Sequence, residues 1–107
     1  MEGEKIQVGG ITLTVLHTPG HAAGHLCFYS AEEKVIFTGD LLFAGAVGRY
    51  DFEDGDVGLL KESLRRIMEL PEDTTIYSGH GPSTTVGQER NGNPFVRRWK
   101  LHCKDER

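Results

Sequence analysis

The stretch KVIFTGD, at residues 34–40, decides the fold of this chain. Its first five residues are almost wholly apolar, which predicts a strand with neighbours on both sides, at the centre of a sheet. Gly39 and Asp40 close that strand. A polar side chain directly after a central strand lies at the rim of the sheet, where binding and catalytic residues are commonly found.

Four more strands are predicted around the central one. The first two alternate apolar with polar residues and are separated by Gly9-Gly10, a pair that permits the positive φ of a hairpin turn. They therefore form a hairpin with one buried face. The five predicted strands cover residues 5–9, 11–16, 25–30, 34–38 and 74–78.

One amphipathic helix is predicted between the fourth and fifth strands. Asp56 caps it, its apolar residues recur on one face over residues 57–70, and Pro71 ends it. Residues 41–55 before it are rich in glycine and follow neither period, so they are predicted to form a long functional loop. Two shorter helical pieces are expected at residues 84–90 and 97–107, the second fraying into a polar tail.

Length and charge narrow the class of protein. The 107 residues suffice for one domain or part of one, and the net charge of −4 argues against broad binding to nucleic acid or to an anionic membrane. No apolar run approaches the roughly 18 residues of a membrane span, and the first residues do not resemble a secretory signal, so a cytoplasmic location is expected. Cys27 and Cys103 are expected to be free thiols.

Polar side chains follow the ends of three predicted strands: His17 and His21, then Asp40, then His80. Strand ends converge on one rim of a sheet, and flanking glycines let the backbone bend tightly there. Imidazole nitrogen and carboxylate oxygen suit zinc, iron or manganese. Taken singly, each histidine also fits a surface or hydrogen-bonding role and Asp40 a turn, so the residues alone leave both interpretations open.

Five motifs occur in a defined order and spacing. They are HTPGHAAGH at 17–25, FTGD at 37–40, GRYDF at 48–52, SGHGPSTT at 78–85, and Glu89 with Asn93-Pro94. Together they resemble the C-terminal half of the metallo-β-lactamase fold, closest to its glyoxalase II-like (hydroxyacylglutathione hydrolase-like) branch. The resemblance implies an α/β (α+β) architecture, half of an αβ/βα sandwich, with a mostly antiparallel or mixed sheet and helices on one face. It implies a half-domain at residues 1–96, followed by a terminal helix and polar tail at 97–107.

The resemblance also implies a role for each site residue. His21 is expected to bind a first metal, His80 a second, and Asp40 to bridge both and act as the catalytic carboxylate. Other residues are expected to shape and brace the site without binding metal, Arg49 and Asp51 as an ion pair. These supporting residues are His17, His25, Thr38, Gly39, Arg49 and Asp51.

The implied chemistry is metal-assisted hydrolysis of a small-molecule thioester. In the complete family site, a hydroxide shared by two zinc ions attacks the thioester carbonyl, and iron or manganese are alternative metals. The family's Thr-His-x-His-x-Asp-His segment belongs to the preceding half, and no His-x-His occurs in these 107 residues. The sequence is therefore expected to provide about half of a dinuclear site.

Three interpretations follow from this half site. In the first, a complementary N-terminal half completes a thioester hydrolase. In the second, the chain belongs to a mononuclear iron dioxygenase of the same fold that acts on persulfides, using two histidines and one aspartate. In the third, it is a non-catalytic half-domain that forms a homo-oligomer or binding module through the apolar strands at 34–38 and 74–78.

Overall fold

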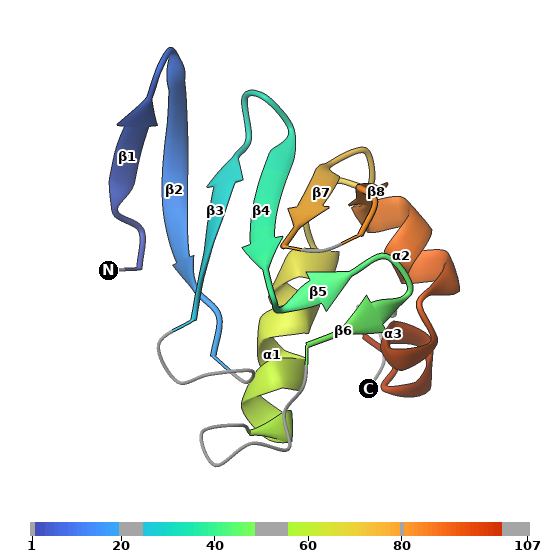
Figure 1. The fold of residues 1–107 in the computed structure, drawn as a ribbon. Helices are drawn as coiled ribbons and strands as arrows, with labels where there is room; N and C mark the ends of the chain where they lie inside the picture. Colours follow the sequence, from blue (N-terminus) through green and yellow to red (C-terminus); the bar gives the residue numbers. More distant parts are fainter. Residues whose placement is uncertain (1, 20–24, 49–55, 80, 102–107) are drawn as a thin grey trace.

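A six-stranded mixed sheet, in the order β1-β2-β3-β4-β7-β8, forms the centre of the fold (Figure 1). This computed structural model describes residues 2–19, 25–48, 56–79 and 81–101. Neighbouring strands pair antiparallel except β4 and β7, which are parallel. The strands of this sheet are β1 (Lys5–Val8), β2 (Ile11–His17), β3 (Leu26–Ser30), β4 (Val35–Gly39), β7 (Thr75–Ser78) and β8 (Thr84–Thr85).

The central position predicted for residues 34–38 is confirmed, because β4 lies between β3 and β7. Its two faces differ, however. Ile36 and Thr38 are fully buried, whereas Phe37 between them is 41% exposed. The strand is therefore apolar on both faces, as its sequence indicates, but covered on only one.

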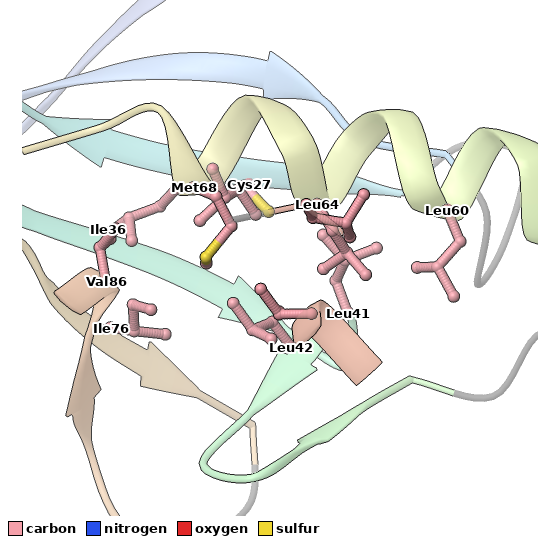
Figure 2. Packing of buried hydrophobic residues seen from close by; sticks show 12 residues of the cluster. Cys27, Ile36, Leu41, Leu42, Leu60, Leu64, Met68, Ile76 and Val86 are labelled. Atoms are coloured by element: carbon pink, nitrogen blue, oxygen red, sulfur yellow. The ribbon is translucent and has the colours of Figure 1, made fainter. Parts of the chain in front are cut away.

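The covered face packs against α1 (Val57–Met68), which crosses the sheet in Figure 1. Asp56 caps this helix by accepting a hydrogen bond from the Leu59 amide at 3.0 Å, as predicted. The buried helix residues meet Cys27 and Ile36 of the sheet, with Leu41 and Leu42 beside them (Figure 2). The buried residues of α1 are Leu60, Ser63, Leu64, Ile67 and Met68.

A small hairpin occupies part of the segment predicted as a loop at residues 41–55. It consists of β5 (Leu42–Phe43) and β6 (Ala46–Val47), which pair antiparallel. Gly45 adopts a φ of 78°, which suits glycine in a tight turn. Strands of two residues are too short to show an alternating pattern, so they cannot be predicted from the periodicity of the sequence. Residues 49–55 lie outside the described part of the chain.

The C-terminal helices begin at positions that differ from the prediction. The helical piece expected at 84–90 is β8 followed by α2 (Val86–Gly92), and the helix expected from residue 97 is α3 (Pro94–Arg98). Asn93 caps α3, and Pro94 occupies its first turn, where the missing N–H costs nothing. The helix therefore crosses the boundary expected between residues 96 and 97. Residues 102–107 are not among those described.

No helix in the described part of the chain is long and apolar enough to span a membrane.

Replacing Leu64 with alanine tests the core between α1 and the sheet. Leu64 is fully buried, so Leu64→Ala should lower the free energy of unfolding by roughly 2–5 kcal/mol. Leu59 is 45% exposed on the same helix, and Leu59→Ala should change it by about 0.5 kcal/mol or less. Urea unfolding of both variants checks this, and equal losses would contradict the described packing.

Candidate metal centre

The carboxyl ends of three strands meet at one edge of the sheet (Figure 1). His17 ends β2, Gly39 ends β4 next to Asp40, and Ser78 ends β7 next to Gly79. The Gly79 amide donates a hydrogen bond of 2.7 Å to the Gly39 carbonyl, which joins the last two strand ends. The convergence expected from the sequence is therefore present for these three strands.

The predicted site residues divide into two sets. His17, His25, Thr38, Gly39 and Asp40 are described by the structure, whereas His21, Arg49, Asp51 and His80 lie outside the described residues and remain predictions. Within the described residues, no three His, Cys, Asp or Glu side chains form a group that could hold a metal. Two of the three expected ligands, His21 and His80, lie outside those residues.

Asp40 lies directly against Gly79. A Cβ atom added to Gly79 would be only 2.9 Å from Asp40 Oδ1 and 3.3 Å from the Gly39 carbonyl oxygen. The carboxylate therefore occupies space that any larger residue at position 79 would need. Because His80 follows Gly79 in the chain, this contact brings Asp40 to the segment that carries the next expected ligand.

The ring of His25 lies beside the residue before Asp40. Its Nε2 would be 3.2 Å from a Cβ atom at Gly39, whose φ of +57° is itself a conformation that favours glycine. On the other side of the ring, Nδ1 shares a hydrogen bond of 3.2 Å with Thr18 Oγ1, which also contacts Cys27 Sγ at 3.2 Å. A buried hydroxyl thus orients His25 toward Gly39.

Thr38 fixes the turn that contains Asp40. This residue is fully buried, and its Oγ1 donates to the Leu42 carbonyl at 2.9 Å. The Leu41 amide donates to the Thr38 carbonyl at 3.0 Å, which closes a tight turn around positions 39 and 40. Side-chain and backbone bonds from one residue therefore hold both ends of the turn.

Two residues of α1 hold the backbone at the end of β2, and neither is among the site residues predicted from the sequence. Ser63 Oγ donates to the Pro19 carbonyl at 2.7 Å, and Arg66 Nη1 donates to the His17 carbonyl at 2.9 Å. Arg66 also pairs with Glu2 at 2.8 Å, and this hydrogen bond lowers the pKa of the Glu2 carboxyl. A polar Ser63 within the apolar face of α1 was the available signal.

These contacts fit the metal chemistry expected of the edge. A carboxylate held at a joint between two strands, with its backbone fixed from several sides, can offer oxygen ligands without a large ordering cost on binding. Thr38, Gly39, His25 and Gly79 surround Asp40 in this way. The donor set of one carboxylate and two neutral imidazoles suits zinc, iron or manganese.

Replacing Gly79 with alanine should displace the Asp40 carboxylate. The added Cβ would approach Asp40 Oδ1 to 2.9 Å, so Gly79→Ala is expected to cost roughly 1–3 kcal/mol of folding stability. It should also shift the NMR resonance of the Asp40 carboxyl carbon. Gly92→Ala, in α2 with nothing within 4 Å of the added atom, is the control and should do neither. An unmoved Asp40 resonance in Gly79→Ala would contradict the described contact.

The buried thiol of Cys27 should make stability fall at high pH. Burial raises the pKa of this thiol from 9.0 to about 11. Between these pH values the unfolded chain releases the thiol proton while the folded chain keeps it, so folding stability declines by up to about 2–3 kcal/mol. In Cys27→Ala this decline is absent, and the stability difference between wild type and variant should shrink as the pH rises from 9 to 11. Urea unfolding across that range measures it, and a constant difference would disprove the assignment.

Comparison with known proteins identifies the family. Residues 2–80 match the family model of the metallo-beta-lactamase superfamily. Hydroxyacylglutathione hydrolase GloC of Haemophilus influenzae is 47% identical over 96 residues, which are 89% of this chain and 45% of that protein. The solved structure of TTHA1623 in a di-iron-bound form superposes with a TM-score of 0.80 at 47% identity, over 89% of this chain and 46% of that one.

ETHE1 from Myxococcus xanthus superposes with a TM-score of 0.83 at 32% identity, over 95% of this chain and 48% of that one. The chain spans about half the length of these relatives. The fold class expected from the sequence is therefore confirmed. The matched family model covers most of the residues, including the strands that lead to Asp40, and the chain belongs to the metallo-β-lactamase superfamily.

Proposed function

We propose that this chain provides the C-terminal half of a dinuclear metallohydrolase that cleaves thioesters, with His21, Asp40 and His80 as its metal ligands. The observation that carries the proposal is the position of Asp40. Its carboxylate lies at the joint between parallel β4 and β7 and contacts Gly79, the residue before His80. The name of the Haemophilus influenzae relative, a hydroxyacylglutathione hydrolase, supports a thioester as the substrate class.

Each described residue has a part in this proposal. Asp40 would hold both metals; the Thr38 hydroxyl and the Gly39 turn fix its direction, and His25, bonded to Thr18, supports that turn. When bound, the metals supply a hydroxide nucleophile near neutral pH and polarise the thioester carbonyl. Zinc is the metal expected from the family resemblance, and the di-iron-bound form of a 47% identical structure supports iron as well.

The face of the sheet turned away from α1 supports a complementary half. Strand pairing places Phe28 opposite both Val15 and Phe37, and Phe37 opposite Tyr77, so these side chains share this open face. Phe37 and Tyr77 stack with ring centroids 5.5 Å apart, yet they are 41% and 45% exposed. Val15 is buried on this face, whereas β1, β3, β4 and β7 each carry a large apolar side chain that is at least 36% exposed. The large hydrophobic residues exposed on this face are Ile6, Val8, Leu26, Phe37 and Tyr77.

A second sheet packed on this open face would give the two-layer arrangement that apolar sheet faces require. Relatives of about twice the length have the residues for such a layer. Charge does not oppose it, since the strand residues on the open face are apolar or neutral apart from His17 at one end. We therefore assign this face to the N-terminal half, which would carry the remaining metal ligands.

Reconstitution tests the proposal. The chain is combined with a separately expressed N-terminal half of the Haemophilus influenzae relative, and bound metal and hydrolysis of a hydroxyacylglutathione thioester are measured. Both should rise on mixing, and Asp40→Asn should lower hydrolysis by about a thousandfold or more. Phe37→Asp should prevent association, whereas Val57→Asp, at a position 39% exposed on α1, should not. No gain in metal or hydrolysis on mixing would overturn the proposal.

A second copy of the chain is the alternative occupant of the open face, and it would make the chain a non-catalytic homo-oligomer. If a second copy covers the face, light scattering of the chain alone should give twice the chain mass of 11.9 kDa, and the Phe37→Asp variant should give the mass of a monomer. A monomeric mass for a folded sample excludes it.

The second alternative function, an iron persulfide dioxygenase, can be distinguished from a thioester hydrolase by its product. Sulfite formed from glutathione persulfide by the iron-loaded reconstituted protein would support the dioxygenase, and activity with zinc alone would exclude it.

A further inference from the structure

Glu89 is a buried carboxylate to which the proposed reaction assigns no role. It lies on α2 and is only 4% exposed. Its Oε1 accepts hydrogen bonds from the Gly45 amide at 2.9 Å and from Asn93 Nδ2 at 2.7 Å, and Thr84 Oγ1 donates to Oε2 at 2.7 Å. A buried carboxyl with three donors is costly to place unless all of its contacts form, so its position is tightly specified.

Two of these contacts reach the β5–β6 hairpin. The Gly45 amide lies at the tip of the hairpin, and Asn93 Nδ2, which bonds Glu89, also donates to the Ala46 carbonyl at 3.3 Å. Glu89 and Asn93 therefore bind two consecutive residues of the hairpin, Gly45 and Ala46. Leu42 is fully buried and Val47 packs partly against the core, but two strands of two residues form only a marginally stable hairpin without further support.

The base of the same hairpin is joined to the turn that holds Asp40. Leu42 follows Asp40 by two residues, and its carbonyl accepts the Thr38 hydroxyl at 2.9 Å. The Gly48 amide donates to the Leu41 carbonyl at 2.7 Å, and this bond closes the base of the hairpin next to Asp40. A displacement of the hairpin tip is thus transmitted through paired strands to the residues on both sides of the carboxylate.

We propose that Glu89 is a positioning residue: by holding the β5–β6 hairpin at Gly45, it fixes the direction in which Asp40 presents its carboxylate to metal. The inference rests on the proposed metal role of Asp40. It extends the proposed function by including α2, an element distant from Asp40 in the sequence, among the parts of the chain that set metal affinity.

Two substitutions at Glu89 separate geometry from charge. Glu89→Asp keeps the charge but withdraws the carboxylate from Gly45 by about 1.5 Å, the length of one carbon–carbon bond. Glu89→Gln keeps the length and an oxygen that accepts from Gly45 and Asn93, while its amide can donate to Thr84. Thr84→Val is the matched control, because it removes a hydrogen bond to Glu89 Oε2 and leaves the hairpin contact intact.

The first measurement is amide hydrogen exchange of the metal-free chain. In Glu89→Asp the amides of Gly45 and Gly48 should exchange about tenfold faster, while those of β2 and β3 keep their wild-type rates. Glu89→Gln and Thr84→Val should resemble wild type at Gly45. Unchanged exchange at Gly45 in Glu89→Asp, or an equal acceleration in all strands, would overturn the inference.

The second measurement is titration with Co²⁺ alone, followed by its visible absorption. Glu89→Asp should weaken binding by about tenfold or more and alter the spectrum, with Glu89→Gln and Thr84→Val remaining within about threefold of wild type. Equal losses in Thr84→Val and Glu89→Asp would show a general effect of stability and overturn the inference. If Asp40→Asn binds Co²⁺ as tightly as wild type, the proposed metal site is wrong. Hydrogen exchange at Gly45 does not depend on metal, so it still shows whether Glu89 holds the hairpin.

Discussion

The parallel pairing of β4 with β7 is the constraint on which the rest of the structure depends. Parallel strands need a crossover between them, and here residues 40–74 supply it, with α1 returning the chain across one face of the sheet. The pairing brings Gly39 and Gly79 into direct backbone contact at 2.7 Å. The parallel pairing of β4 with β7 therefore accounts both for the hydrophobic core under α1 and for the sheet edge that holds Asp40.

Strong periodic signals were enough to predict most of the fold. The apolar run at 34–38 predicted the central strand, and the spacing of Leu60, Leu64 and Ile67 together with the Asp56 cap predicted α1. The β5–β6 hairpin could not be predicted, since its strands of two residues show no alternating pattern and its tip is held by a distant side chain, Glu89. The start of α3 differs from the prediction for a local reason: Asn93 caps the helix and Pro94 begins it, so the helix starts three residues before position 97.

The residue types of the candidate site could be predicted from the sequence, but the contacts that hold its backbone in place could not. Glycines beside polar residues at strand ends pointed to Asp40, and the structure places that carboxylate at the joint of two strands. The contacts by which Ser63 and Arg66 of α1 hold the end of β2 could not be predicted, because both are made to backbone carbonyls. Side-chain patterns carry little information about which distant carbonyl a donor will reach.

The open face of the sheet also determines how this chain responds to heat. Unfolding exposes less new apolar surface when Phe37 and Tyr77 are already partly in contact with water, so the heat-capacity increment per residue falls below that of a two-layered domain of equal length. The free energy of unfolding then varies less steeply with temperature on either side of its maximum. Covering the face by association reverses this, because burying the same rings gives binding a negative heat-capacity change. Calorimetry can therefore distinguish the isolated half from its covered state.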